Sequence, residues 1–124
     1  MAIILLYGGR KHKMPKRYYL IFDNKGFEDY KSWLSQDKSK YKRIHMLIQS
    51  IQRYGPLEGE GKPEVLKRDY KGCYSRRIDE KNRLIYKYEK DDSSSSTIIL
   101  GCADHYSGKE NTEKQRLLNK LSLN

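Results

Sequence analysis

The chain contains little cysteine and no long apolar run. Cys73 and Cys102 are its only cysteines, and neither belongs to a CxxC or Cys/His pattern with zinc-ligand spacing. We therefore expect no metal, no cofactor and two reduced, semi-buried thiols, with a disulfide between them left as an alternative. The apolar stretch 3–7 is too short for a membrane helix or a signal peptide, and basic residues follow it rather than precede it. These absences predict a cytoplasmic protein without a membrane segment.

Positive charge dominates among the residues that are present. The 124 residues include 26 Lys and Arg against 16 Asp and Glu, which gives a formal net charge of +10 at pH 7. This excess predicts binding to a polyanion, most often nucleic acid, or to an acidic protein, while a basic surface that only confers solubility is the alternative. Eleven tyrosines against two phenylalanines and one tryptophan favour nucleic acid, because tyrosine can stack on bases as well as pack.

One domain is predicted, with an extension at each end. A chain of 124 residues supports one modest core, and the patterned elements run from residue 17 to residue 106. Residues 1–16 are predicted to be a disordered extension or a mis-assigned start, since Met14 shortly precedes the first convincing strand. The intact mass of the natively expressed protein tests this, because a product that begins at Met1 would contradict a start at Met14. Residues 107–124 are a C-terminal extension in which 113–121 can form a short helix.

The N-terminal half of the domain predicts a strand and two helices. Residues 17–23 are rich in β-formers, and Asp23 can cap a helix that begins near Phe27. The apolar face of this first helix carries Phe27, Tyr30, Trp33 and Leu34. Asp37 can cap a second helix, which stops at 54–56 and whose apolar face carries Tyr41, Ile44, Leu47, Ile48 and Ile51. The other face of this helix is equally compatible with solvation and with RNA contact, and carries Lys38, Lys40, Lys42 and Arg43.

The C-terminal half predicts a run of strands. They are expected at 66–70, 73–79, 82–89 and 97–105, and their short connections favour antiparallel hairpins. Residues 91–96 form a polar loop between two of them. The expected architecture is therefore α+β, with two N-terminal helices packed on a twisted, mainly antiparallel sheet of four to five strands.

Strand parity predicts which face of this sheet is open. With a three-residue loop at 80–82, Asp79 pairs with Arg83 and Arg77 with Ile85, so that Arg77 and Arg83 share one face. A two-residue turn would instead mix charge and core on both faces. The opposite face is the predicted core, although it also holds one charged side chain, and comprises Tyr74, Arg76, Ile78, Leu84, Tyr86 and Tyr88.

The last strand alternates in the same way. We expect the core-facing side chains of this strand to be those of Ile98, Leu100 and Cys102. The opposite set carries small residues that leave room for a ligand ahead of a histidine, and comprises Ile99, Gly101, Ala103 and His105.

Chemically active side chains from several stretches are predicted to converge on the open face: Glu64, Lys67, Arg77, Arg83 and His105. Glu64 and Lys67 are three residues apart, so a helical turn after Pro63 is needed to bring them to one side. The set supplies a base, an acid and fixed cations, which suit metal-independent cleavage of a phosphodiester. The base would activate a ribose 2′-OH, so the substrate would be RNA. His105 can act as acid or base around neutrality. No comparable set of reactive side chains is predicted around His12 or His45.

Four motifs carry this set: Lys62-Pro63-Glu64-Val65-Leu66-Lys67, Gly72-Cys73-Tyr74-Ser75-Arg76-Arg77-Ile78, Asn82-Arg83-Leu84-Ile85-Tyr86 and Cys102-Ala103-Asp104-His105-Tyr106. In order and approximate spacing they resemble the YoeB/Txe toxins of the RelE superfamily, and the resemblance covers about residues 17–106. It implies a RelE-like, microbial-RNase-like fold and the toxin of a bacterial type II toxin–antitoxin pair. The chain departs from the family pattern at Tyr74, where tryptophan is common, at Ala103-Asp104 and in its longer tail.

The resemblance also implies an activity and its residues. It implies an mRNA endonuclease that cuts in the ribosomal A site and is neutralised by an acidic YefM-type antitoxin. A homodimer and a monomer both remain open from the sequence. Carried over position by position, the resemblance implies Glu64 as general base and His105 as general acid. The positions implied for phosphate and base binding are Lys67, Arg77, Arg83 and Tyr106.

Two other functions remain open from the sequence. A non-catalytic module that binds RNA or an antitoxin and represses its own operon would share the basic composition. A gyrase-poisoning toxin is a further alternative within the superfamily, but it would leave the base, the cations and the histidine without a task.

Overall fold

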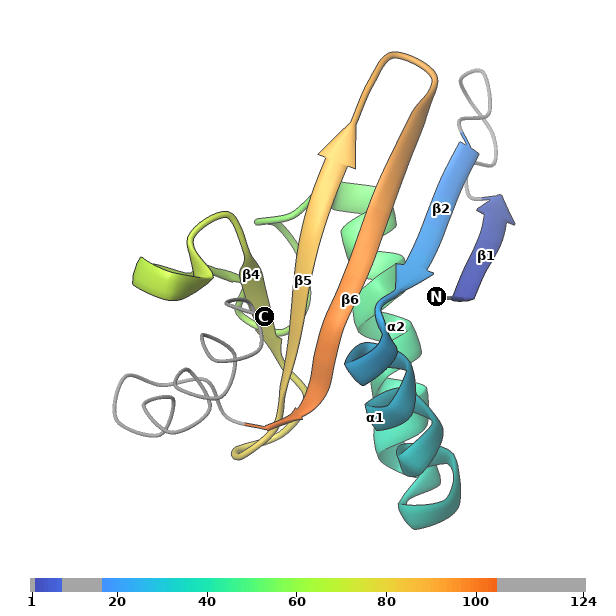
Figure 1. The fold of residues 1–124 in the computed structure, drawn as a ribbon, viewed down its shortest axis with the longest axis vertical. Helices are drawn as coiled ribbons and strands as arrows, with labels where there is room; N and C mark the ends of the chain where they lie inside the picture. Colours follow the sequence, from blue (N-terminus) through green and yellow to red (C-terminus); the bar gives the residue numbers. More distant parts are fainter. Residues whose placement is uncertain (1, 8–16, 105–124) are drawn as a thin grey trace, which may run out of the picture.

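Two helices pack on one side of a six-stranded sheet in the computed structural model, which describes residues 2–7 and 17–104 (Figure 1). The helices are α1 (Asn24–Gln36) and α2 (Lys38–Tyr54), and a 3-10 turn, η1, spans Arg68–Tyr70. The strands are β1 (Ala2–Tyr7), β2 (Arg17–Phe22), β3 (Glu64–Val65), β4 (Tyr74–Arg77), β5 (Arg83–Lys90) and β6 (Ser94–Asp104). Their order in the sheet is β1-β2-β6-β5-β4-β3; β2 and β6 are parallel and every other neighbouring pair is antiparallel.

The predicted α+β architecture is confirmed. Strands β2 to β6 form the predicted mainly antiparallel sheet, and the two N-terminal helices cover it. The structure differs at the N-terminus, where residues 2–7 form β1 and pair with all six residues of β2 instead of remaining disordered. The start at Met14 stays a prediction, and the predicted extension at 107–124 lies outside the described residues.

The helix boundaries agree with the capping signals in the sequence. Asp23 caps α1 and its side chain accepts a hydrogen bond from the backbone N–H of Gly26 at 2.7 Å. Asp37 caps α2 in the same way and accepts from the N–H of Ser39 at 3.0 Å. Gly55 ends α2 with a positive φ of 92°, a conformation that glycine adopts without strain. Local chemistry therefore determines where both helices begin and where α2 ends.

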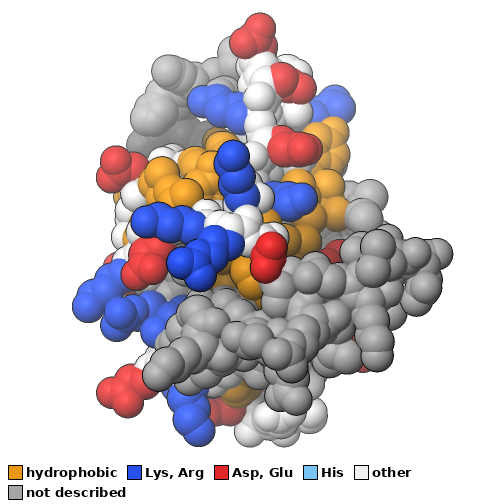
Figure 2. Space-filling view, turned by 60° about the vertical axis from the view of Figure 1, so that its left-hand side comes forward, with side chains coloured by type: hydrophobic (Ala, Val, Ile, Leu, Met, Phe, Trp, Pro, Cys, Tyr) orange, Lys and Arg blue, Asp and Glu red, His pale blue; other side chains and the backbone are white. Residues whose placement is uncertain are grey.

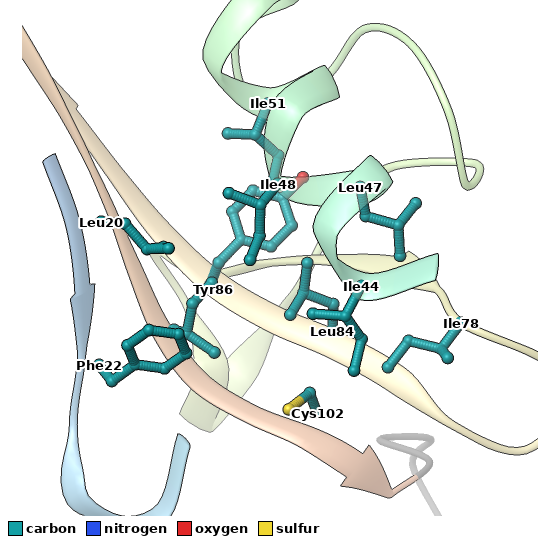
Figure 3. Packing of buried hydrophobic residues seen from close by; sticks show 11 residues of the cluster. Leu20, Phe22, Ile44, Leu47, Ile48, Ile51, Ile78, Leu84, Tyr86 and Cys102 are labelled. Atoms are coloured by element: carbon teal, nitrogen blue, oxygen red, sulfur yellow. The ribbon is translucent and has the colours of Figure 1, made fainter. Parts of the chain in front are cut away.

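The core lies between the helices and the sheet. Side chains of α2 point toward β5 and β6 and pack against residues of β2 (Figure 3). The fully buried part of this cluster includes Phe22, Ile44, Leu47, Ile51, Leu84, Tyr86, Ile99 and Cys102. The predicted apolar face of α1 is right for Phe27, Tyr30 and Trp33, which pack against the core. It is wrong for Leu34, which is 50% exposed because it lies at the edge of that face.

The predicted register of the β4–β5 hairpin is wrong by two residues. Arg77 pairs with Arg83 and Ser75 with Ile85, so the connection comprises the five residues 78–82. The Asp79 carboxylate accepts hydrogen bonds from the backbone N–H groups of Lys81 and Asn82, which closes the longer loop. A shift of two residues preserves the faces of both strands, so the prediction that Arg77 and Arg83 share one face is confirmed.

The predicted facing of β6 is wrong in its first half. Ile99 is fully buried in the core, whereas Ile98 and Leu100 are only half-buried. The cause is a break in the pairing with β5: Tyr86 is opposite Ile99, but Ile85 is opposite Gly101. The extra residue on β6 forms a β-bulge, at which the alternation of side chains between the two faces shifts by one residue. Cys102 therefore faces the core, as Ile99 does. Single-sequence alternation contains no signal for such a bulge.

Two further boundaries differ from the prediction. The strand predicted at 66–70 is the two-residue β3 followed by η1, because Tyr70 N–H bonds back to the carbonyl of Lys67 and closes a turn. The polar loop predicted at 91–96 is shorter, since Ser94 already belongs to β6. There the Asp91 carboxylate accepts from the N–H groups of Ser93 and Ser94 and tightens the hairpin.

Gly26 provides a stability test of the contact between α1 and β6. A Cβ at this buried position would overlap the backbone carbonyl of Ile99, which cannot move without disturbing β6. We expect Gly26→Ala to destabilise the fold by about 2 kcal/mol or more, the usual result of overpacking. Urea unfolding measures the change, and Ser35→Ala at an exposed site on α1 is the matched control, expected to stay within about 0.5 kcal/mol of wild type.

Candidate active site

Glu64 lies at one edge of the sheet, on the side opposite the helices. It belongs to β3, where it is exposed and pairs with Ser75 of β4. The predicted helical turn after Pro63 is wrong: Glu64 and Val65 are strand, and Lys67 is still extended with φ −121° and ψ 175°. Extended residues three apart face opposite sides. Lys67 is therefore exposed just beyond β3 rather than beside Glu64 on the same face.

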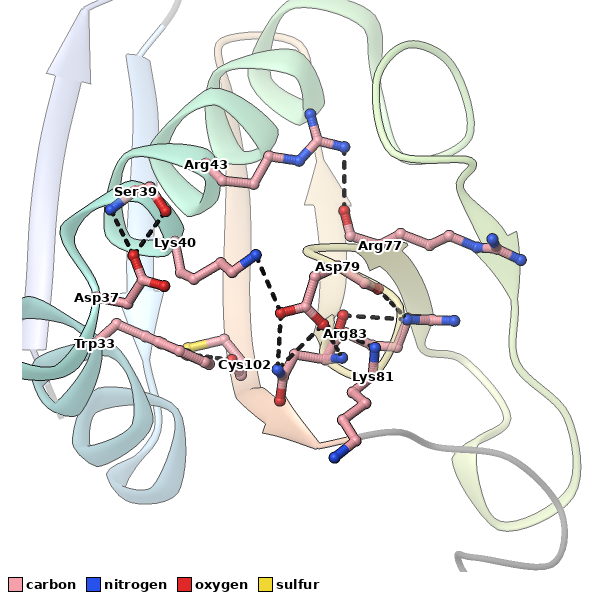
Figure 4. A network of polar contacts seen from close by, with 11 residues as sticks. Trp33, Asp37, Ser39, Lys40, Arg43, Arg77, Asp79, Lys81, Arg83 and Cys102 are labelled. Carbon is pink, nitrogen blue, oxygen red and sulfur yellow. Dashed lines mark hydrogen bonds and ion pairs between the residues drawn. The ribbon is translucent and has the colours of Figure 1, made fainter.

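Arg77 and Arg83 are direct neighbours across β4 and β5. Arg77 lies two residues beyond Ser75, so both side chains of β4 emerge on the face that carries Glu64. In Figure 4 the side chains of Arg77 and Arg83 extend to the same side, away from α2. The structure therefore brings together one carboxylate and two guanidinium groups out of the predicted set.

These residues lie in two rows across the strands. One row runs from Glu64 through Ser75 and Ile85 to Gly101, and the next runs from Arg77 through Arg83 to Asp104. With strands about 4.8 Å apart, the Cα atoms of Glu64 and Arg83 are separated by roughly 12 Å, a gap that two long side chains and a phosphate between them can fill. Lys and Arg side chains also gather over the middle of the molecular face shown in Figure 2.

The half-buried guanidinium of Arg83 is held by the β4–β5 loop. Its Nη1 donates to the backbone carbonyl oxygens of Asp79 at 2.7 Å and Asn82 at 3.2 Å. Among the described residues no side chain neutralises it, and Nε and Nη2 have no hydrogen-bond partner there. The loop therefore fixes the cation while leaving donors for a ligand.

Asp79 is what holds this loop in shape. Burial favours the neutral acid, but hydrogen bonds from the Asn82 side chain, from two backbone N–H groups and from Lys40 outweigh it and lower the pKa of Asp79 to about 2. Lys40 of α2 lies 3.4 Å from the Asp79 carboxylate (Figure 4). The ionised carboxylate thus connects α2 to the loop that carries Arg83.

The basic face of α2 partly serves the fold. Besides Lys40, Arg43 donates to the backbone carbonyl of Arg77 at 3.2 Å and pairs with Glu60 at 3.3 Å. Lys38 and Lys42 are exposed. Two of the four cations considered for solvation or RNA contact are therefore engaged with the strands and loops around the candidate site.

Arg76 points to the opposite side of β4 and is fully buried. Its five guanidinium N–H groups find five acceptors: Tyr86 Oη, Ser50 Oγ and the backbone oxygens of Gly55, Glu58 and Glu60, at 2.7 to 3.0 Å. No carboxylate among the described residues pairs with it. This charged side chain, which the sequence places in the core face, fastens residues 55–60 to β4.

Two side chains of α1 hold the backbone of β6 near its end. Trp33 Nε1 donates to the carbonyl oxygen of Cys102 at 2.6 Å, and the N–H of Cys102 donates to the Asp29 carboxylate at 3.0 Å. β6 ends at Asp104, opposite Arg83. His105 and Tyr106, the predicted acid and binding residue, follow directly in the sequence but lie outside the described residues.

Other chemistry is sparse in the described part of the chain. Cys73 and Cys102 are free, as predicted, but buried rather than semi-buried, and burial raises the pKa of both thiols. No group of three His, Cys, Asp or Glu side chains that could hold a metal occurs between residues 17 and 104. Neither α1 nor α2 combines the length and apolarity needed to cross a bilayer.

Asp79, Ser50 and Trp33 support the site but are not among the predicted site residues. Each contacts backbone far from it in the sequence or across a loop. Asp79 carried a detectable signal, since Asp followed by Asn in a polar connection is typical of side-chain-closed turns. Ser50 and Trp33 carried none, because their partners become neighbours only in the folded chain.

Comparisons with known proteins identify relatives for this arrangement. Residues 22–106 match the family model described as "YoeB-like toxin of bacterial type II toxin-antitoxin system". Toxin YoeB of Streptomyces coelicolor is 42% identical over 87 residues, which cover 70% of this chain and 98% of that protein.

Solved structures agree with the sequence match. The YoeB-YefM complex from Staphylococcus aureus is similar at 44% identity and a TM-score of 0.61, covering 70% of this chain and 95% of that one. The YoeB dimer from the same organism is similar at 45% identity, with the same TM-score of 0.61 and the same coverage of 70% and 95%.

The acid dependence of stability tests the role of Asp79. Because its pKa is lowered to about 2 in the folded chain, its contribution to stability is complete above the unfolded value near 3.8 and is lost as the pH falls toward 2. We expect Asp79→Asn to be less stable than wild type at pH 5, with the difference shrinking between about pH 4 and pH 2. Urea unfolding at several pH values measures it. Asp92→Asn, at an exposed hairpin position, is the control, and a gap independent of pH would contradict the assignment.

Proposed function

Because this chain belongs to the YoeB family of toxins from bacterial type II toxin–antitoxin systems, we propose that it is a metal-independent endoribonuclease. In this proposal it acts in the cytoplasm and cleaves mRNA in the ribosomal A site. One observation carries the proposal: the exposed Glu64 shares a sheet face with the directly paired Arg77 and Arg83. A carboxylate beside two cations on an exposed face suits an anionic substrate whose reaction needs a base.

The proposed reaction is attack by a ribose 2′-OH on the adjacent phosphate. Glu64 takes the 2′-OH proton as the bond from the 2′-oxygen to phosphorus forms. Arg83 and Arg77 stabilise the negative charge that builds on the phosphorane oxygens. The bond from phosphorus to the 5′-oxygen then breaks, and His105 donates a proton to the leaving 5′-oxygen. The products are a 2′,3′-cyclic phosphate and a 5′-hydroxyl, and the protonation states of Glu64 and His105 are exchanged in the process.

Arg83 is the stronger of the two charge stabilisers because its guanidinium is held in place. Two backbone carbonyls hold its Nη1, so little reorganisation accompanies the charge that develops in the reaction. The Arg77 side chain is exposed and binds the substrate phosphate. Lys67 lies beyond β3 and faces away from Glu64, so its assignment to phosphate binding comes from the family resemblance alone. Tyr106 is assigned to orienting the base or the phosphate, by the family resemblance alone.

The proposed protein partners follow from charge and from the relatives. A net charge of +10 suits both a ribosome and an acidic antitoxin of the YefM type. The complex and the dimer from Staphylococcus aureus support an antitoxin partner and a homodimer for this chain. A non-catalytic module that binds RNA or antitoxin for operon control is the alternative, and cleavage mapping separates the two.

Substitution of the base and the acid tests the activity. We expect Glu64→Ala and His105→Ala each to reduce mRNA cleavage on ribosomes by on the order of 10² to 10⁴-fold, the usual contribution of a positioned proton-transfer group. Antitoxin binding should persist in Glu64→Ala, since the fold does not depend on an exposed carboxylate, and we expect it to persist in His105→Ala as well. Primer extension after induced expression maps the cleavage, and Glu89→Ala, at an exposed site on β5, is the matched control. Full cleavage by both variants would refute the assigned roles.

A further inference from the structure

We infer that Ser50 and Arg76 are positioning residues for Glu64: they fix the loop that delivers this carboxylate to the candidate site. The inference rests on the proposed function and adds two residues on the opposite side of the sheet that do not contact RNA. Ser50 is on α2 and Arg76 on β4, and both are buried, with exposed fractions of 6% and 0%. Neither can be a catalytic residue, because neither reaches the face that carries Glu64.

Glu64 needs support beyond its own strand. β3 has only two residues, and a strand that short pairs weakly by itself. The preceding stretch contains four residues with positive φ, namely Gly55, Gly59, Gly61 and Lys62. Glycine-rich backbone of this kind has many accessible conformations unless tertiary contacts select one. The position of Glu64 therefore depends on what holds residues 55–62.

Ser50 and Arg76 hold this stretch from beneath. Arg76 donates to the carbonyls of Gly55, Glu58 and Glu60 at 2.9, 2.7 and 2.8 Å. Ser50 Oγ accepts both from the N–H of Glu60 at 2.9 Å and from Arg76 Nη1 at 3.0 Å. Both backbone groups of Glu60, four residues before Glu64, are thus fixed by this pair.

The remaining chain to Glu64 is short and restricted. The carbonyl of Gly61 accepts from the N–H of Arg77 at 2.7 Å, and Pro63 limits the next backbone angle. Glycine is required along this path, because a Cβ on Gly59 would overlap Ser50 Oγ and one on Gly61 would lie 2.6 Å from Leu47 Cδ2. A displacement of Ser50 or Arg76 therefore also displaces Glu64, because the backbone between them has little freedom to compensate.

Two substitutions that remove different numbers of hydrogen bonds from the loop test the inference. Ser50→Ala removes one acceptor from Glu60 N–H and one from Arg76 but keeps the side-chain volume nearly unchanged. Arg76→Lys keeps the charge but offers three donors in place of five. We expect Ser50→Ala to reduce the single-turnover cleavage rate on ribosome-bound mRNA by on the order of tenfold at saturating toxin, because small misplacements of a catalytic group are costly. Arg76→Lys should reduce it further, with half-saturating toxin concentrations unchanged for both.

A double-mutant cycle separates positioning from general loss of structure. If Ser50 acts through Glu64, Ser50→Ala should have no further effect in the Glu64→Ala background. Rates are compared at a temperature where circular dichroism shows each variant folded, and Ser35→Ala on α1 is the matched serine control, expected to cleave at the wild-type rate.

Each result of the cycle has a distinct meaning. A wild-type rate for Ser50→Ala, or an equal loss from Ser50→Ala with and without Glu64, would overturn the inference while leaving the proposed base intact. Full cleavage by Glu64→Ala alone would overturn the proposed function, and this inference with it. Non-additive losses in the cycle, with unchanged half-saturation, support both.

Discussion

The buried guanidinium of Arg76 is the interaction on which the candidate site depends. A buried charge without a carboxylate partner is stable only if its polar groups are satisfied, and here all five N–H groups meet oxygen acceptors. Three of these acceptors are backbone carbonyls of the loop 55–60, which Arg76 thereby holds against β4. Removing the side chain would leave several partly buried acceptors without a donor, a loss of about 3 kcal/mol or more in total. The burial of Arg76 therefore requires the loop 55–60 to adopt the conformation that supplies its hydrogen-bond acceptors.

Side chains of β4 alternate between the two faces of the sheet and have a different role on each face. Arg76 faces the helices and secures the loop that leads to Glu64, while Ser75 and Arg77 on either side of it face the candidate site. The second cation, Arg83, is secured separately by the Asp79 loop, which α2 reaches through Lys40. Support for the carboxylate and support for the cation thus come from different contacts of the same helix. This arrangement explains how Glu64, Arg77 and Arg83 can share a defined face.

Sequence reasoning succeeded where the signal is local. Caps at Asp23 and Asp37, the apolar face of α2 and the shared face of Arg77 and Arg83 follow from short-range patterns. It failed where the deciding contact is distant or irregular. The bulge in β6 reversed the facing of Ile99, the Asp79 loop lengthened the β4–β5 connection, and nothing local indicated that Ser50 would meet Glu60. Arg76 was the one visible conflict, a charge in a core face, and it marks the supporting network rather than an error in the strand assignment.

The chemistry of the cleaved ends tests the central claim most directly. If Glu64 activates a ribose 2′-OH between the cations of β4 and β5, cleavage of ribosome-bound mRNA must yield a 2′,3′-cyclic phosphate upstream and a 5′-hydroxyl downstream. A single 2′-deoxy substitution at the cut nucleotide must abolish cleavage at that bond. Mass spectrometry of the fragments identifies both ends. Fragments with a 3′-hydroxyl and a 5′-phosphate, or undiminished cleavage of the 2′-deoxy substrate, would contradict the account.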